Sequence, residues 1–186
     1  MKTYNIKERI KEYFFMNPTA KLRVRQIERE MKMPLPSVIR YCKELEKEEI
    51  LKKESISGVS TYSAYRNSKK FLIAKRLFNI NLIFESGLIE HMVKEYFNPV
   101  IVLFGSYSKG EDTEESDIDL YIETPKNQEF NLQKFEKILG RRIQVFNYRK
   151  IREVPNHHLS NNIINGITLN NFLEAFTRKS HPGGNA

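Results

Sequence analysis

One stretch of the chain decides both its fold and its chemistry: residues 100–123, which read VIVLFGSYSKGEDTEESDIDLYIE. The first five residues are large and apolar, which predicts a buried strand that runs directly into a Gly-Ser pair. A second predicted strand carries Asp117 and Asp119 with Ile118 between them. Since successive side chains of a strand point to opposite faces, we expect both aspartates on one face and Ile118 in the core.

The aspartates and the Gly-Ser pair together suit the handling of phosphates. Two carboxylates on one strand face repel each other, and a divalent cation between them, preferably Mg²⁺, allows both to stay ionised. Gly105 lets the backbone approach a phosphate closely, and a helix that begins after Ser106 directs free N–H groups at it. Nucleotidyl transfer requires this combination. The alternative, a solvated aspartate pair on an edge strand, leaves the phosphate loop unexplained.

This pattern resembles the minimal nucleotidyltransferases of the DNA polymerase beta-like superfamily. Their signature is Gly-Ser, ten residues, then Asp-x-Asp, and here Gly105-Ser106 is followed by residues 107–116 and then by Asp117 and Asp119. The resemblance covers about residues 81–186 and implies a small mixed-sheet α/β fold. It also implies Mg²⁺ or Mn²⁺ at the two aspartates, and a nucleoside triphosphate, expected to be ATP, as substrate. The residues that it assigns to nucleotide binding are Gly105, Ser106, Lys109, Gly110 and Ser116.

One departure from the family affects catalysis. Active members usually carry a third carboxylate on a later strand, where it helps to deprotonate the attacking hydroxyl. The matching strand here is expected over residues 141–146, with Gln144 at that position. Glutamine is a weak neutral ligand and no general base, and Glu123 lies too far along its strand to substitute. Two hypotheses therefore stay open: an active transferase, or a non-enzymatic regulator that senses nucleotide or dimerises through a degenerate domain.

The family resemblance also suggests a partner. Small nucleotidyltransferases of this kind often act as antitoxins that transfer AMP to a hydroxyl, commonly a tyrosine, of a HEPN-domain toxin. By resemblance, a HEPN-domain toxin is the expected protein partner and AMP transfer the expected reaction. The sequence leaves open whether the chain forms a homodimer.

The first half of the chain is strongly basic. Residues 1–80 contain 19 Lys and Arg against 9 Asp and Glu, whereas the whole chain has a net charge of +8. The excess of positive charge therefore lies in the first half, which predicts two modules with different partners. A basic module attracts polyanions such as nucleic acid, although a basic solvated surface is the simpler alternative.

The apolar periodicity of the basic half predicts a compact helical module. Ile6 and Ile10 begin one helix that Asn17-Pro18 ends, and further helices are expected around Ile27 and from Pro36. Two short strands follow around the turn at residues 57–58. This order resembles a winged helix-turn-helix. Winged helices also serve as protein–protein modules, which is the alternative to DNA binding.

A winged helix places a short helix in the major groove and its hairpin on the flanking phosphates of double-stranded DNA. The residues expected to contact DNA lie on the second helix, the third helix and the hairpin: Arg23, Arg25, Ser37, Arg40, Tyr41, Lys43, Lys52, Lys53 and Arg66. Cys42, the one cysteine, is expected to be a buried core residue.

The expected fold class is α+β with three parts. A winged helix-turn-helix domain spans residues 1–68, a connecting helix spans residues 69–80, and a nucleotidyltransferase domain spans residues 81–186. A second helix is expected over residues 81–97. The longest purely apolar run has five residues and no apolar leader is seen, so we expect no membrane span and a cytoplasmic protein.

Overall fold

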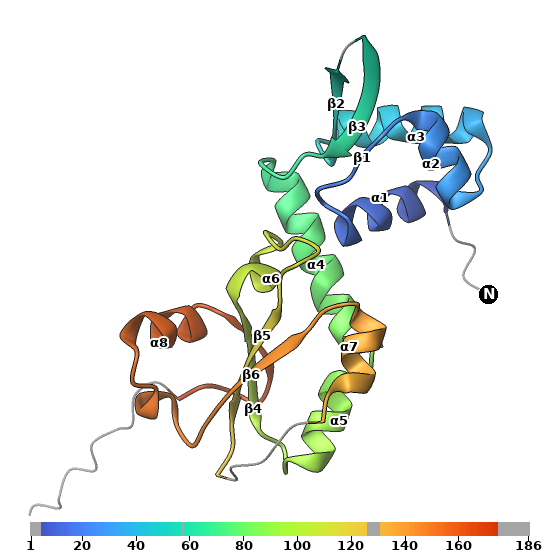
Figure 1. The fold of residues 1–186 in the computed structure, drawn as a ribbon. Coiled ribbons are helices and arrows are strands. Elements are labelled where there is room, and N and C mark those ends of the chain that lie inside the picture. The colour runs from blue at the N-terminus through green and yellow to red at the C-terminus, as the bar shows by residue number, and fades with distance from the viewer. Residues whose placement is uncertain (1–4, 57, 126–130, 175–186) are drawn as a thin grey trace, which may run out of the picture.

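The computed structural model describes residues 5–56, 58–125 and 131–174 (Figure 1). One long helix, α4 (Lys69–Glu85), joins an N-terminal module to a C-terminal module, and each module contains a small sheet. The mixture of helices and two small sheets agrees with the expected α+β class. Among the described residues, no helix combines the length and the apolar character needed to cross a membrane.

The N-terminal module consists of three helices and three short strands. Its elements are α1 (Ile6–Met16), β1 (Lys21–Leu22), α2 (Val24–Met31), α3 (Leu35–Lys47), β2 (Leu51–Ile56) and β3 (Val59–Ala64). The strands form an antiparallel sheet in the order β1-β3-β2. Asn17 ends α1 and Pro36 lies in the first turn of α3, as predicted. The sequence did not reveal β1, because two residues cannot show an alternating pattern.

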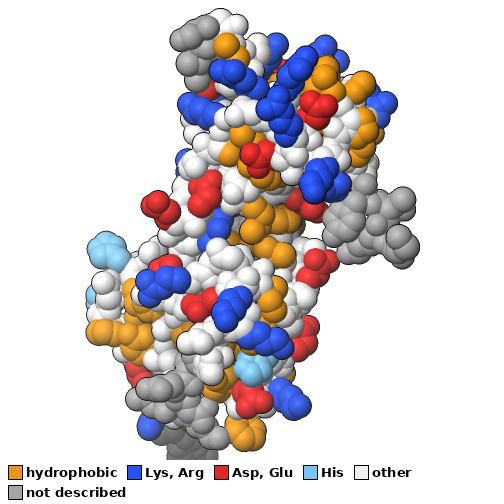
Figure 2. Space-filling model, turned by 45° about the vertical axis from the view of Figure 1, so that its right-hand side comes forward, with side chains coloured by type: hydrophobic (Ala, Val, Ile, Leu, Met, Phe, Trp, Pro, Cys, Tyr) orange, Lys and Arg blue, Asp and Glu red, His pale blue; other side chains and the backbone are white. Residues whose placement is uncertain are grey.

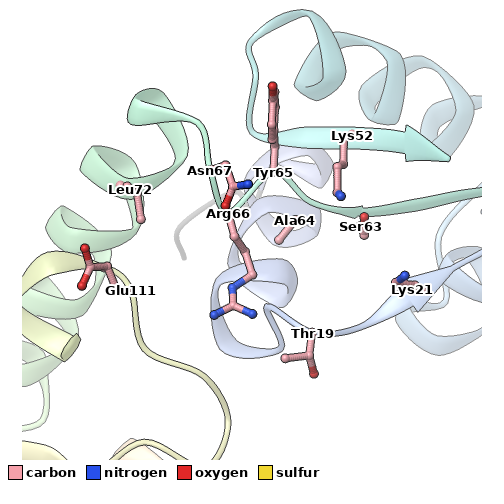
Figure 3. Close-up of a pocket in the computed structure, with 11 residues that line it drawn as sticks. Thr19, Lys21, Lys52, Ser63, Ala64, Tyr65, Arg66, Asn67, Leu72 and Glu111 are labelled. Atoms are coloured by element: carbon pink, nitrogen blue, oxygen red, sulfur yellow. The ribbon is translucent and has the colours of Figure 1, made fainter.

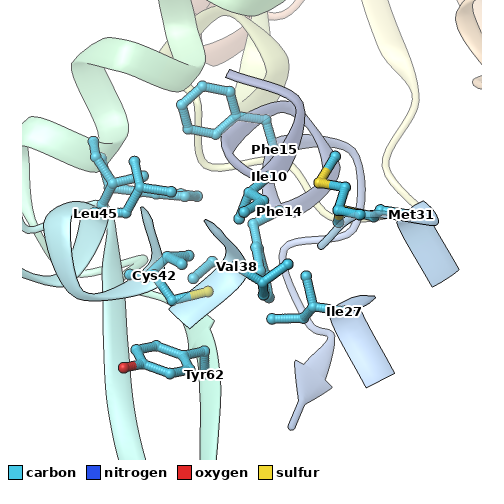
Figure 4. Packing of buried hydrophobic residues seen from close by; sticks show 14 residues of the cluster. Ile10, Phe14, Phe15, Ile27, Met31, Val38, Cys42, Leu45 and Tyr62 are labelled. Carbon is cyan, nitrogen blue, oxygen red and sulfur yellow. The ribbon is translucent and has the colours of Figure 1, made fainter. Parts of the chain in front are cut away.

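The three helices bury their apolar faces against one another and against the sheet (Figure 4). Ile10, Ile27 and Cys42 are fully enclosed, one from each helix, and Tyr62 packs from β3. Burial raises the pKa of the Cys42 thiol to about 12, which keeps it protonated at neutral pH. The prediction that Cys42 is a core residue is therefore confirmed.

The connecting helix is longer than the sequence suggested. A helix over residues 69–80 and a second over 81–97 were expected, but α4 continues to Glu85 and α5 (Leu88–Glu95) follows it. The expected break was wrong because nothing near residue 80 interrupts a helix. The break falls at Gly87, whose left-handed φ of 75° most residues avoid.

The C-terminal module is a four-stranded sheet in the order β6-β5-β4-β7. Its elements after α5 are β4 (Val100–Phe104), α6 (Gly105–Lys109), β5 (Ile118–Glu123), α7 (Gln133–Leu139), β6 (Ile143–Tyr148), a 3-10 turn (Ile151–Glu153), α8 (His157–Ile164) and β7 (Ile167–Asn170). The central strands β4 and β5 are antiparallel, whereas β5 and β6 are parallel. Helices α5 and α7 cover one face of the sheet and α8 covers the other (Figure 1).

A buried polar network fixes the C-terminal module to α4. The Lys75 ammonium lies 2.5 Å from the Asp112 carboxylate, and both side chains are 1% exposed. Asn79 donates to the second Asp112 oxygen at 2.8 Å and to the Tyr107 carbonyl at 2.9 Å. Burial lowers the pKa of Lys75, while the charge of Asp112 opposes that shift. Asp112 therefore anchors the loop between α6 and β5 to the connecting helix.

As sequence, the acidic run over residues 111–115 predicts a solvated loop, and Lys75 lies in a helix of mixed apolar and basic residues that gives no sign of its burial. The structure corrects this interpretation. Asp112 and Lys75 are instead enclosed, and Glu114 accepts hydrogen bonds from the Thr19 N–H at 3.0 Å and from the Thr19 hydroxyl at 3.1 Å. Sequence periodicity cannot reveal such a pair, because its members lie on different elements, 37 residues apart.

The Lys75–Asp112 pair gives the first test. The Asp112→Ala variant should lower the free energy of unfolding by about 3–5 kcal/mol, because it leaves a buried ammonium without its counter-charge. Urea titration followed by circular dichroism measures the loss. Glu115→Ala, an exposed acid of the same loop, is the control and should change stability by less than about 0.5 kcal/mol. A loss for Asp112→Ala no larger than that of the control would contradict the structural role.

Candidate active site

Gly105 and Asp119 meet at the end of the central strands. Phe104 and Asp119 pair directly in the antiparallel ladder of β4 and β5, so Gly105 follows at the strand end. Gly105 has a φ of 72°, and a Cβ atom placed on it would overlap the Asp119 carboxylate and lie 3.1 Å from its Cγ. Only glycine combines this backbone conformation with this space. The two parts of the motif, separate in sequence, therefore touch in the fold.

The two aspartates form a strained anionic pair. Asp117 immediately precedes β5 and Asp119 is its second residue, and both are half-buried while Ile118 between them is fully enclosed. Burial and, after it, the charge of Asp117 raise the pKa of Asp119. A cation between the carboxylates would remove this penalty, and paired carboxylate oxygens are ligands for a hard divalent ion. The donor set therefore fits Mg²⁺ or Mn²⁺.

A third carboxylate is absent from the position beside this pair. In the parallel ladder of β5 and β6, the partner of Asp119 is Gln144, whose side chain is exposed. The described residues hold no cluster of three or more acidic, histidine or cysteine side chains able to bind a metal. Gln144 offers an amide oxygen as a ligand but cannot accept a proton.

Glu123 does not replace the missing carboxylate. It is 8% exposed and belongs to a separate set of contacts at the far end of β5. Its carboxylate accepts hydrogen bonds from the Tyr121 hydroxyl at 3.0 Å and from the Ile151 N–H at 3.2 Å, and pairs with Lys150 at 2.8 Å. These partners account for its charge, as the sequence-based argument about distance anticipated.

Gly110 and Ser116, both assigned to nucleotide binding, stabilise the local structure around the loop before Asp117. Gly110 ends α6 with a φ of 75°, and a Cβ on it would lie 2.5 Å from the carbonyl oxygen of Leu72 in α4. Gly110 therefore allows α6 to pack tightly on the connecting helix. The Ser116 hydroxyl accepts a hydrogen bond from the Thr113 N–H at 2.9 Å and closes the turn before Asp117. Both residues position the loop that carries the first aspartate.

Besides Gly105, described above, the remaining residues assigned to nucleotide binding are Ser106 and Lys109, both on α6. Ser106 is the second residue of α6 and is half-buried, and Lys109 is exposed in the last turn of the same short helix. Their roles in nucleotide binding stay predictions.

A cavity of about 500 Å³ opens beside Asp117. Its lining includes Lys137, Arg141 and Arg142, which follow or end α7, together with acidic side chains of the loop before β5. Arg141 also donates to the carbonyl of Met16 at 2.9 Å, so it is held in place by the N-terminal module. Sequence reasoning missed these cations because no spacing rule links α7 to the Asp-x-Asp strand.

The cations assigned to DNA contact lie on the N-terminal module, where Figure 2 shows Lys and Arg side chains gathered. The exposed members of the set are Arg23, Arg25, Arg40, Lys43, Lys53 and Arg66, and the half-buried members are Ser37, Tyr41 and Lys52. The Arg40 guanidinium lies 4.4 Å from the centre of the Tyr41 ring and donates to its hydroxyl. Lys52 is paired with Glu54 at 2.5 Å, which reduces its free charge.

Comparisons with known proteins agree with the geometry of the C-terminal module. Residues 88–169 match the family described as nucleotidyltransferase domain. These residues contain α6, the Asp117–Asp119 pair and Gln144. The match supports a nucleotidyl-transfer function.

A protein of Methanocaldococcus jannaschii, named as an inferred protein adenylyltransferase, is 40% identical to this chain over 58 residues, which is 27% of this chain and 58% of the relative. The chain thus spans less than two thirds of the length of that relative. No solved structure matches the chain.

Gly105 provides a test of the site with a built-in control. Gly105→Ala and Gly87→Ala place an alanine at nearly the same positive φ, but only the first meets a neighbour, because nothing lies within 4 Å of a Cβ at Gly87. Gly105→Ala should cost about 1–3 kcal/mol more in unfolding free energy than Gly87→Ala, since the Asp119 carboxylate must move. Chemical denaturation measures both.

The same two variants, Gly105→Ala and Gly87→Ala, also distinguish a loss of stability from a loss of metal binding. Mg²⁺ or Mn²⁺ should raise the melting temperature of the wild type and of Gly87→Ala but not that of Gly105→Ala, because a cation stabilises the state that binds it. Equal metal-dependent shifts in the two variants would show that Gly105 does not position the metal ligands.

Proposed function

We propose that this chain is a Mg²⁺-dependent nucleotidyltransferase that transfers AMP from ATP to a hydroxyl group of a partner protein. The observation that carries the proposal is the contact of Gly105 with Asp119, beside Asp117, at the start of α6. A phosphate-binding turn and a carboxylate pair meet there, within the residues that match the nucleotidyltransferase domain. The named function of the Methanocaldococcus jannaschii relative supports a protein as acceptor.

In the proposed reaction, the acceptor oxygen attacks the α-phosphorus of ATP, the bond to the β-phosphate breaks, and pyrophosphate leaves. Asp117 and Asp119 hold the divalent cation, which when bound neutralises phosphate charge and aligns the reacting oxygens. Ser106 and the free N–H groups at the start of α6 hold a phosphate. Gln144 cannot take the hydroxyl proton, and Asp117 and Asp119 would be engaged with the cation, so in this proposal the proton leaves to water.

A second candidate is a regulator without catalytic turnover. Gln144 opposite Asp119 favours it, because the usual third carboxylate is replaced by a neutral amide. In that case the C-terminal module would bind nucleotide or mediate assembly. The complete Gly-Ser and Asp-x-Asp arrangement favours the transferase.

For the N-terminal module we propose a winged helix-turn-helix that binds double-stranded DNA. Its order of elements, with α2 and α3 followed by the antiparallel strands β2 and β3, supports the proposal. Arg40 and Lys43 are exposed on α3, where a groove-facing helix would carry them, and Lys53 is exposed on β2. A protein-binding winged helix is the alternative.

The two proposed modules together suggest a biological role. A DNA-binding module joined to a protein-modifying module would suit an antitoxin that controls its own operon and acts on a HEPN-domain toxin. The toxin, a homodimeric state and a cytoplasmic location remain predictions.

Incubation with α-³²P-labelled ATP, Mg²⁺ and the protein encoded beside this gene tests the transferase. We expect label on the partner, and we expect Asp117→Ala with Asp119→Ala to abolish it, because the cation loses both carboxylate ligands. Labelling by the double variant at the wild-type level would refute the site. A circular dichroism melt of the double variant controls for folding.

The Gln144→Asp variant separates the two candidates within the same experiment. If turnover is limited by the missing base, Gln144→Asp should raise the labelling rate, and Gln144→Ala should not. ATP binding by the wild type with no labelling by wild type or Gln144→Asp would favour the regulator.

A gel shift on the duplex upstream of the gene, repeated at rising salt, tests DNA binding. Affinity should fall steeply with salt, and Arg40→Ala and Lys43→Ala should each weaken binding and reduce the slope of log K against log salt by about 1. Arg152→Ala, an exposed cation of the C-terminal module, is the matched control and should leave the slope unchanged. The absence of a shift at about 50 mM salt would contradict the proposal.

A further inference from the structure

A second cavity, of about 780 Å³, lies between the two modules (Figure 3). Its walls come from β1, β2 and β3, from residues 65–67, and from the start of α4 with the loop after α6. The polar side chains that matter here are Thr19, Lys21, Lys52, Ser63, Arg66 and Glu111. None of the candidate active-site residues lines it except Gly110, through the backbone that packs on α4.

Ser63 is the most informative residue of this cleft. It lies on β3, is 5% exposed, and its hydroxyl has no hydrogen-bond partner among the described residues. Figure 3 shows its side chain directed to the same side of the sheet as that of Lys52. A buried hydroxyl without a partner costs about 1–3 kcal/mol relative to one that is bonded. The folded chain therefore keeps a polar group here at a cost in stability.

Three cations line the same cleft as this hydroxyl: Lys21 and Lys52, the neighbours of Ser63 on the adjacent strands, and Arg66. In Figure 3 the Arg66 side chain extends between the modules toward Thr19. Lys21 and Lys52 share the carboxylate of Glu54 at 3.5 Å and 2.5 Å, and each ammonium has three donors, so both can still bind a second acceptor. With Glu111 as the acidic lining residue, the cleft keeps a net positive charge even after Glu54 is counted.

We propose that this interdomain cleft binds a small phosphorylated molecule of nucleotide size at a site distinct from the candidate active site. Phosphate oxygens accept hydrogen bonds from the Arg66 guanidinium and from the Ser63 hydroxyl, which then gains the partner that it lacks. The volume lies in the range of small-molecule sites, about 300–1,000 Å³. Its walls come from both modules, so an enclosed small ligand fits better than a passing DNA backbone.

The position of the cleft suits a ligand that regulates the protein by contacting both modules. Ser63 and Arg66 belong to the N-terminal side, whereas Glu111 belongs to the loop that leads to Asp117. A molecule bound between them contacts both modules at once. This proposal does not rest on the proposed transferase activity.

Calorimetric titration in EDTA tests the site on the full chain carrying Asp117→Asn and Asp119→Asn, which removes the metal-dependent site. Inorganic pyrophosphate should bind with one molecule per chain. Arg66→Ala and Ser63→Ala, each added to that background, should weaken binding at least tenfold. Ser63→Ala should also keep or raise the melting temperature, because it removes an unpaired buried hydroxyl.

Matched controls separate a built site from diffuse charge. Ser60→Ala, an exposed position of the same strand, and Arg29→Ala, an exposed cation of α2, should leave pyrophosphate binding unchanged. ATP binding tighter than inorganic triphosphate would identify a nucleotide, and equal binding would identify recognition of phosphate alone. The proposal is overturned if pyrophosphate does not bind, if Arg66→Ala has no effect, or if Arg29→Ala weakens binding as much as Arg66→Ala.

Discussion

The buried ion pair between Lys75 and Asp112 is the contact on which the arrangement of this molecule depends. Two charges enclosed at 2.5 Å are stable only while both are present and hydrogen-bonded, and Asn79 supplies the additional bond to Asp112. The pair joins the middle of the connecting helix to the loop between α6 and β5. That loop leads directly to Asp117, so the helix that links the modules also fixes the approach to the candidate active site.

At the candidate active site, two local features are energetically unfavourable. Gly105 holds a left-handed backbone conformation, and Asp119 occupies the space that any larger residue at position 105 would need. Burial and the neighbouring Asp117 disfavour ionisation of Asp119. Arrangements of this kind are typical of functional sites, since a bound cation offsets the repulsion between two neighbouring carboxylates. Gln144 does not relieve that repulsion, because an amide carries no charge.

The two modules also meet outside the ion pair. Glu114 accepts hydrogen bonds from Thr19, and Arg141 donates to Met16, so the loop before β5 and the residue that follows the C-cap of α7 both touch the N-terminal module. Glu114 and Arg141 line the cavity beside Asp117, and Thr19 lines the cleft that contains Ser63. Such a connection gives a physical route by which a ligand at one place can influence the other, through a loop that both modules hold.

The sequence by itself determined the local elements and the motif of this protein. Alternation placed Ile118 in the core and the aspartates on the opposite face, and proline and apolar spacing placed the first three helices, because these signals depend on neighbours in the chain. The family resemblance, rather than any pattern of neighbours, pointed to Gln144 at the position of the third carboxylate. The strand that carries it runs over Ile143–Tyr148 instead of 141–146, and its pairing with Asp119 became visible only in the fold.

Only the tertiary structure decided which charges are buried. Lys75, Asp112 and Glu114 look like surface residues in sequence. The burial of Lys75 and Asp112, and the half-buried position of Glu114, follow from contacts between segments that lie 37 and 95 residues apart. The task of Gly110 and the unpaired hydroxyl of Ser63 depend likewise on what packs against them. The burial of a side chain and the identity of its hydrogen-bond or ion-pair partners depend on contacts in the folded chain. A pattern of neighbouring residues in the sequence does not contain that information.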